Sequence, residues 1–113
     1  MCMKITKEDL LRVNAGFGGN LRSGSSIDFA FHMAESKKIG IYKKLACLWR
    51  AILVDHPFSD GNKRTAAFAS FAFATENDKI VDRDLLIHHI VSVAKNNIID
   101  INNIERRLKN AIR

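Results

Sequence analysis

One short stretch of this sequence gathers side chains that can do chemistry. From His56 to Arg64 it reads His-Pro-Phe-Ser-Asp-Gly-Asn-Lys-Arg, which supplies a base, a carboxylate, an amide and two adjacent cations. The segments on either side, residues 45–54 and 66–74, are strongly apolar. The sequence therefore predicts a polar loop held between two buried helices. Such a loop suits phosphate chemistry and indicates an enzyme acting on a nucleotide.

The second half of the stretch predicts an anion-binding helix start. A helix N-terminus leaves backbone N–H groups unpaired and carries a partial positive charge. Gly61 lets the backbone approach a phosphate closely. The first helical turn that follows contains Asn62, Lys63 and Arg64. Cations there oppose the helix dipole until an anion arrives, and such a local conflict is typical of a functional site.

An acid and a base precede that helix start. Asp60 offers a single hard oxygen ligand, which suits an Mg²⁺ ion that keeps its waters and bridges phosphate oxygens. Imidazole is the side-chain group that ordinarily titrates near neutral pH, so His56 fits a general base for a hydroxyl nucleophile. We therefore expect a metal ligand at Asp60 and a catalytic base at His56.

Each of these residues also has an ordinary structural explanation. A histidine at a helix end is often a capping residue, and Asp60 followed by Gly61 can form a turn with a helix N-cap. Lys63 and Arg64 can be solvated surface charge. The residues taken together in this order are far more specific than any one of them alone.

The flanking sequence predicts the helices that position the loop. We expect Thr6 to cap the first helix and Ser26 the second, with a glycine-rich loop over residues 14–25 between them. The third helix spans residues 41–55, is nearly all apolar after its first turn and is hence central. Pro57 stops it, because proline biases the preceding residue away from helix.

Three more helices complete the predicted fold. The fourth starts at residues 61–62 and runs to about residue 76, with alanines that allow close packing. Two further starts are expected, at Asp82 or Arg83 and at Asp100 or Asn102. Only residues 79–81 resemble a strand, and they are too few to form a sheet. The prediction is an all-α, compact single-domain bundle of about six helices over residues 1–113.

Composition excludes several classes of protein. No apolar run approaches the roughly 20 residues of a membrane span, and no apolar signal region follows Met1. Cys47 lies inside an apolar run and is expected to be a buried free thiol. We therefore expect a cytoplasmic protein with no membrane partner.

The net charge of +6 has a local source, because residues 101–113 carry much of it. A basic tail could bind nucleic acid. No aromatic residue lies among these charges to stack on bases, however, and cations are favoured near a helix C-terminus by the helix dipole. The sequence therefore favours a basic last helix, or attraction to an acidic protein partner, over nucleic-acid binding.

The stretch from His56 to Arg64 resembles the signature of the Fic/Doc superfamily, His-x-Phe-x-(Asp/Glu)-(Gly/Ala)-Asn-(Gly/Lys)-Arg, and fills every defined position. Residues 5–11 and 20–22 also resemble the opening of death-on-curing proteins, and residues 65–107 have the spacing of their last helices. The resemblance implies a base at His56, an Mg²⁺ ligand at Asp60 and an inward anchor at Phe58. It further implies a cradle for ATP phosphates formed by Gly61, Asn62, Lys63 and Arg64.

Lys63 indicates a branch of the family. Most Fic enzymes have glycine at this position and transfer AMP, whereas the Doc branch has lysine and is associated with transfer of the γ-phosphate. The bulk and charge of Lys63 would change how the nucleotide binds. Gly61, in contrast, is the Fic-like choice where Doc itself has alanine. The resemblance favours a Doc-like kinase and leaves an AMP transferase as the alternative.

The resemblance also implies regulation by a partner. Self-inhibited Fic enzymes carry a Ser/Thr-x-x-x-Glu-(Gly/Asn) helix, and the nearest candidate, Glu76-Asn77, has Ala72 where a hydroxyl is required. We interpret the chain as a Doc-like toxin, inhibited by an antitoxin, that transfers a phosphoryl group from Mg-ATP to a protein hydroxyl. A translation factor is the target that the family implies. A second alternative is a catalytically silent binding module for an acidic partner or nucleic acid.

Overall fold

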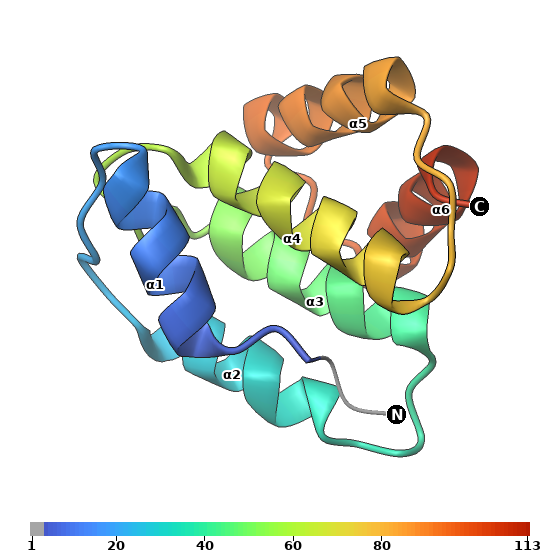
Figure 1. Ribbon diagram of the computed structural model, residues 1–113, viewed down its shortest axis with the longest axis horizontal. Coiled ribbons are helices and arrows are strands. Elements are labelled where there is room, and N and C mark those ends of the chain that lie inside the picture. Colours follow the sequence, from blue (N-terminus) through green and yellow to red (C-terminus); the bar gives the residue numbers. More distant parts are fainter. Residues whose placement is uncertain (1–3) are drawn as a thin grey trace.

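Apolar faces at helical spacing bring six helices together around one core. In chain order these are α1 (Lys7–Gly16), α2 (Ser25–Ala34), α3 (Ile41–Leu53), α4 (Asn62–Glu76), α5 (Arg83–Asn96) and α6 (Ile101–Ala111). The computed structural model describes residues 4–113, and no β-sheet occurs among them (Figure 1). The predicted all-α bundle of about six helices is therefore confirmed.

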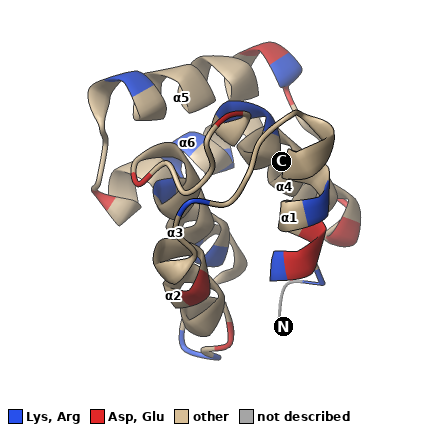
Figure 2. Ribbon diagram, turned by 90° about the vertical axis from the view of Figure 1, so that its left-hand side faces the viewer, with Lys and Arg blue, Asp and Glu red and all other residues tan. Residues whose placement is uncertain are grey.

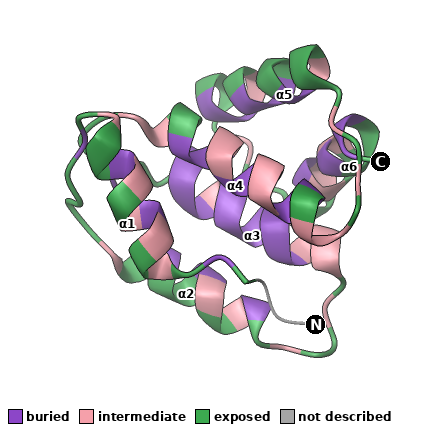
Figure 3. Cartoon of the chain, viewed as in Figure 1, coloured by how far each residue is buried: buried purple, intermediate pink, exposed green. Residues whose placement is uncertain are grey.

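Helix α3 is the centre of the core. It packs against α2, α4, α5 and α6, and all of its residues from 44 to 53 except Arg50 are buried. Figure 3 shows it as a nearly continuous purple ribbon behind α4. The helix ends at Leu53, short of the predicted residue 55: Val54 is its C-cap, residues 54–55 form a turn, and His56 follows with a left-handed φ of 49°.

Helix α4 packs on α3 through small residues and one buried hydrogen bond. Ala66 and Ala69 are buried, as their small size allows. Trp49 Nε1 on α3 donates to Ser70 Oγ on α4 over 2.8 Å, and both side chains are fully buried. Because an unsatisfied buried donor costs about 1–3 kcal/mol, this bond fixes how the two helices sit on one another. They are the helices that hold the predicted loop.

The helix starts show which caps the sequence predicted correctly. Thr6 caps α1 as predicted, and α5 and α6 begin after Asp82 and Asp100, each one of the two starts predicted for its helix. All three side chains accept a backbone N–H of the first turn. The cap predicted at Ser26 is wrong, because α2 begins at Ser25 after Gly24, which has no side chain to cap with. The Gly24 carbonyl already accepts a helical hydrogen bond, so the helix starts earlier than predicted.

The predicted loop over residues 14–25 is shorter than expected, because residues 14–16 form the last turn of α1. The strand-like residues 79–81 make only an isolated bridge, between Val81 and Ile112. Hydrogen bonds on either side, from Asp82 N to Ala111 O and from Arg113 N to Ile80 O, are both 2.8 Å long. They tie the end of α6 to the α4–α5 connection.

No helix among residues 4–113 is long and apolar enough to cross a membrane. Cys47 is a buried free thiol, as predicted, and burial raises the pKa of this thiol above its ordinary value. The expectation about the segment after Met1 falls in part on residues 1–3, which lie outside the described residues.

His89 is a buried titratable group between α5 and α6. Its Nδ1 lies 3.1 Å from an Arg107 guanidinium nitrogen. Since a guanidinium only donates, Nδ1 must accept, and the imidazole is neutral. Burial lowers the pKa of His89 below its ordinary value, and the positive charges of Arg107 and His88 lower it further. The neutral ring therefore suits this contact between α5 and α6.

We predict that this histidine makes the protein less stable in acid. The unfolded chain takes up a proton near the ordinary pKa of histidine, about 6.5, whereas folded His89 resists it to lower pH. The stability that His89 contributes is therefore present above that pH and is lost as pH falls through the folded pKa. Urea unfolding between about pH 7.5 and pH 5.5 should show a smaller loss in His89→Gln than in the wild type.

The exposed His32 on α2 provides the matched control. His32→Gln should keep the wild-type pH dependence. If all three proteins lose stability equally on acidification, His89 is not the source of the effect.

Candidate functional site

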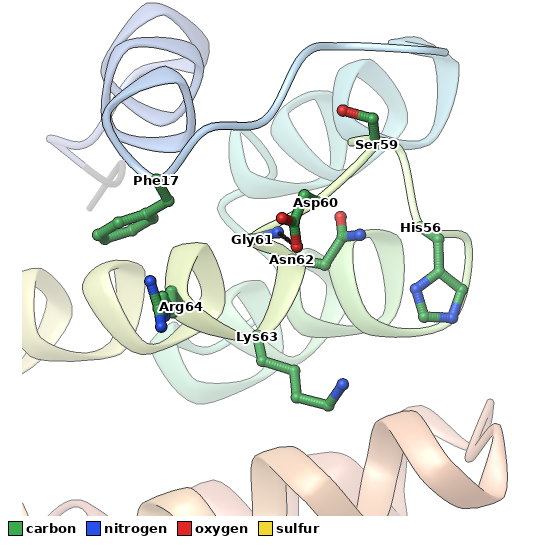
Figure 4. Close-up of a pocket in the computed structure, with 8 residues that line it drawn as sticks. All are labelled: Phe17, His56, Ser59, Asp60, Gly61, Asn62, Lys63 and Arg64. Atoms are coloured by element: carbon green, nitrogen blue, oxygen red, sulfur yellow. Dashed lines mark hydrogen bonds between the residues drawn. The ribbon is translucent and has the colours of Figure 1, made fainter.

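The loop between α3 and α4 opens onto a cavity of about 340 Å³. Every residue that the sequence singled out as a site residue lines this one cavity, together with two residues that it did not. The complete lining is Phe17, His56, Ser59, Asp60, Gly61, Asn62, Lys63 and Arg64 (Figure 4). Its lining residues place the cavity between the end of α1 and the start of α4, two segments that Figure 1 shows close together.

Gly61 makes the turn that starts α4. Its φ of 73° and ψ of 16° are left-handed, a conformation that glycine adopts without steric penalty. A Cβ at this position would lie 3.1 Å from both Asn14 Nδ2 and Phe17 Cβ. Backbone conformation and neighbouring side chains therefore both require glycine here.

Asp60 precedes this turn, and its carboxylate lines the cavity. Oδ1 accepts the N–H of Gly61 over 2.8 Å. The structural alternative that Asp60 caps α4 is excluded, because the N-cap is Gly61 and no side chain among residues 4–113 caps this helix. The carboxylate oxygen that makes no such bond remains for a ligand.

The first turn of α4 concentrates positive charge. Without a side-chain cap among the described residues, its N–H groups stay available to an anion. Lys63 and Arg64 add two exposed cations, and neither forms an ion pair within residues 4–113. Figure 2 shows the blue ribbon of these cations at the start of α4. An anion in the cavity would relieve the conflict between these charges and the helix dipole.

The two cations point in different directions. Figure 4 shows the Lys63 side chain extending toward the side of the loop that carries the His56 ring, whereas Arg64 lies beside Phe17. The Arg64 guanidinium sits 5.9 Å from the centre of the Phe17 ring, within the range of a cation–π contact. The aromatic ring thus restrains Arg64 while leaving its N–H groups free to bind oxygen atoms.

Asn62 uses its side chain to close the loop. Its Oδ1 accepts the N–H of Phe58 over 3.2 Å, and its Nδ2 donates to the carbonyl of Phe58 over 3.0 Å. Phe58 itself is 1% exposed, which confirms the buried position expected for it. The contribution of Asn62 to an anion site is therefore its backbone N–H, while its amide shapes the loop.

His56 lies exposed at the rim of the cavity in a left-handed conformation with φ of 49°. A residue other than glycine in this region is strained by about 1–3 kcal/mol, and such residues cluster at functional sites. The guanidinium of Arg22 donates to the His56 carbonyl over 3.1 Å, and Arg22 N donates to the Pro57 carbonyl over 2.7 Å. These contacts hold the strained segment in place.

The α1–α2 connection pairs with the loop like a short strand. Asn20 N donates to Ser59 Oγ over 2.9 Å, and Ser59 N donates to Asn20 O over 2.8 Å. An antiparallel bridge joins Leu21 to Phe58 beside them. The prediction of a glycine-rich loop over residues 14–25 did not include this pairing, although dense glycines are a signal of close backbone contact.

Asn14 and Gly19 are further site residues that sequence reasoning missed. Asn14 is 1% exposed, and its Nδ2 donates to the Asp60 carbonyl over 2.7 Å. A Cβ at Gly19 would collide with Asn14 Oδ1 and with the Asp60 carbonyl oxygen, so only glycine fits. The end of α1 thus contacts the loop directly.

The side chains that line the cavity limit which metal ion it could hold. Asp60 is the one carboxylate among its lining residues, and no group of three or more His, Cys, Asp or Glu side chains in residues 4–113 could hold a metal. Zinc sites require three or four protein ligands. Mg²⁺ is commonly bound by one or two carboxylates together with waters and substrate phosphates. The donor set therefore fits Mg²⁺ bound together with a phosphate ligand.

The model of the Fic/DOC family matches residues 5–74, which include α1, α2, α3, most of α4 and the complete cavity. Because this match covers more than half of the chain, the protein belongs to the Fic/DOC family. Members of this family are typically transferases, generally of AMP or phosphoryl groups. Comparison with curated proteins and with solved structures gave no match.

We predict that Gly19→Ala damages both fold and cavity. The new Cβ would collide with the Asn14 side chain and the Asp60 carbonyl, and such overpacking typically destabilises by about 1–3 kcal/mol. Gly16→Ala is the matched control, because nothing lies within 4 Å of a Cβ there, and alanine favours the helix that Gly16 ends. Urea unfolding should show a loss of stability for Gly19→Ala alone. Equal stability of the two variants would contradict the contact.

Proposed function

We propose that this chain is an ATP-dependent transferase of the Doc type, which moves the γ-phosphoryl group of Mg-ATP onto a hydroxyl side chain of a protein target. One arrangement carries the proposal. A single cavity joins a histidine, one carboxylate and an uncapped helix start with two cations that have no ion-pair partner among the described residues. Such a site favours a polyphosphate over a neutral ligand.

The start of α4 would bind the phosphates. The N–H groups of its first turn, Lys63 and Arg64 would each donate hydrogen bonds to phosphate oxygens, and Arg64 can do so with two nitrogens at once. Asp60 would hold Mg²⁺, which supplies neutralisation of phosphate charge when it is bound. Positioning and charge neutralisation make up most of what catalysis of phosphoryl transfer requires.

His56 is the proposed general base. In the reaction, the target hydroxyl oxygen forms a bond to the γ-phosphorus, the bond from that phosphorus to the bridging oxygen breaks, and ADP leaves. The hydroxyl proton passes to the His56 imidazole. Because His56 lies exposed at the rim of the cavity, a side chain of a separate protein can reach it.

Lys63 supports γ-phosphoryl transfer over AMP transfer. Its side chain extends on the His56 side of the loop (Figure 4), so its charge attracts a phosphate group close to the proposed base. In AMP transfer the α-phosphorus would have to occupy that place, with pyrophosphate as the leaving group. Lysine at this position is also the feature that the Doc branch shares. AMP transfer remains the alternative function.

Gly61 does not favour the alternative in this chain. Glycine is the Fic-like choice at this position, but here the left-handed φ and the 3.1 Å approach of Asn14 and Phe17 require it. Its presence therefore follows from packing between α1 and the loop. Lys63 is therefore the residue that distinguishes γ-phosphoryl transfer from AMP transfer in this proposal.

We further propose that the protein is a toxin silenced by a separate acidic antitoxin. Glu76, the nearest candidate for an internal inhibitory glutamate, ends α4, and at 1.5 Å per residue it lies about 20 Å from the cavity at the start of the helix. We therefore assign the proposed inhibition to a separate protein. The net charge of +6 favours an acidic partner. The Doc resemblance suggests a translation factor as the target.

Nucleic acid is not proposed as a partner, because part of the basic last helix is engaged within the protein. Arg107 bonds to Asn103 over 2.7 Å and lies 3.1 Å from His89. Lys109 lies 3.7 Å from Glu105. Two of the cations that a nucleic-acid surface would need are therefore already in contact with other side chains of the protein.

We predict that His56→Ala removes transfer while the fold is kept. Loss of a general base lowers a rate by about 10²–10⁴, and the exposed His56 side chain contributes little to packing. Transfer of label from ATP to proteins of a cell lysate measures the activity, and circular dichroism measures the fold. The exposed His32→Ala is the control. Turnover of His56→Ala near the wild-type rate would contradict the assignment.

We predict that wild-type protein transfers label from γ-labelled ATP and not from α-labelled ATP. Lys63→Gly should lose this γ-transfer, because the charge that places the terminal phosphate is gone, and it could gain α-transfer. The exposed Lys37→Gly, in the α2–α3 connection, is the matched control. Label from the α-position on wild-type targets would establish the AMP transferase instead. Label from neither position would favour a silent binding module.

A further inference from the structure

The side chain of Asn14, near the end of α1, is buried against the loop and does not line the cavity. It is 1% exposed. Its Nδ2 donates to the Asp60 carbonyl over 2.7 Å and to Thr65 Oγ1 over 3.1 Å. Both hydrogens of the amide are therefore used, and both partners belong to the segment that forms the cavity.

Thr65 connects Asn14 to the carbonyl group of Gly61. Its Oγ1 donates to the Gly61 carbonyl over 2.8 Å, and its backbone N–H donates to the same carbonyl over 2.9 Å. Asn14 thus fixes the carbonyl of Asp60 directly and supports that of Gly61 through Thr65. These two carbonyls flank the left-handed residue, so their directions decide where the Asp60 side chain and the first N–H groups of α4 point.

Two glycines leave no freedom for the Asn14 side chain. A Cβ at Gly19 would collide with Asn14 Oδ1, and a Cβ at Gly61 would lie 3.1 Å from Asn14 Nδ2. The Asn14 carbonyl also accepts the N–H groups of Phe17 over 2.9 Å and of Gly19 over 3.1 Å. The backbone turn that brings Gly19 into place is therefore built on the same residue as the contact to the loop.

We infer that Asn14 is a positioning residue, which sets the directions of the Asp60 carboxylate and of the first turn of α4 toward a bound Mg-nucleotide. The inference rests on the proposed function in so far as it names that ligand. Asn14 does not line the cavity, so it acts only through the loop. Its effect should fall on the part of nucleotide affinity that depends on Mg²⁺, because Asp60 is the proposed ligand of the metal.

Asn14→Asp tests the inference with a side chain of nearly the same size. It removes both N–H donors and places a carboxylate against the Asp60 carbonyl. We expect the gain in ATP affinity on adding Mg²⁺ to fall roughly 10- to 100-fold, the range seen when residues that orient a metal ligand are changed. Isothermal titration with ATP, with and without Mg²⁺, measures this gain. Thr65→Val, which breaks the same network from the other end, should act in the same direction.

Ser70→Ala is the control for a general loss of stability. It removes the buried acceptor of Trp49 on the same helix and away from the cavity. We expect it to lower the unfolding temperature and to keep the wild-type Mg-ATP affinity. If folded Asn14→Asp and Thr65→Val bind Mg-ATP like the wild type, or if Ser70→Ala loses the same factor, the positioning role is wrong.

The amide signals of Gly61, Asn62 and Lys63 provide a readout that needs no nucleotide. In ¹⁵N-labelled protein they should shift or broaden in Asn14→Asp and Thr65→Val and remain unchanged in Ser70→Ala. A wild type that binds no Mg-ATP would overturn the proposed function, while these signals would still decide whether Asn14 positions the loop. Unchanged signals in both network variants would overturn the inference.

Discussion

The absence of a side chain at two positions is the constraint on which the site depends. At Gly19 and Gly61 the backbone approaches Asn14 so closely that even one added carbon would collide or crowd its neighbours. This closeness lets α1 reach across to the segment between α3 and α4 and hold its carbonyl groups. Helix α1, which is distant in the sequence, therefore determines the shape of the loop. The residues of the loop mainly supply the functional groups of the site.

The buried helices α3 and α4 stabilise the loop between them, whose own conformation and charges are energetically unfavourable. His56 is strained, α4 begins without a side-chain cap among the described residues, and its first turn carries cations that oppose the dipole. Each of these features costs about 0.3–3 kcal/mol. The burial of α3 against four helices offsets such costs, because each fully buried large apolar side chain contributes roughly 1.5–3 kcal/mol. The site can therefore keep charge exposed for a ligand.

Local signals in the sequence predicted the fold and most of the residues that line the cavity. The cap at Thr6 and the apolar run of α3 depend on neighbouring residues and were identified correctly. Asp82 and Asp100 were each one of the two starts predicted for α5 and α6. The loop residues also came together as expected. Asn14 was missed because it contacts Asp60 and Thr65, which lie 46 and 51 positions away. Ser26 was wrongly predicted as a cap, because a serine near a helix start does not show at which residue the helical backbone hydrogen bonds begin. Here they begin at the Gly24 carbonyl.

The single tryptophan gives the protein an internal optical probe. Trp49 is fully buried and bonds from α3 to Ser70 on α4, while the cavity at the end of these helices contains no indole. Its fluorescence therefore comes from one known place between the two helices that carry the loop. A buried indole emits at shorter wavelength than a solvated one, so the emission reports whether those helices are packed together. Changes confined to the cavity can thus be separated from opening of the core without adding a label.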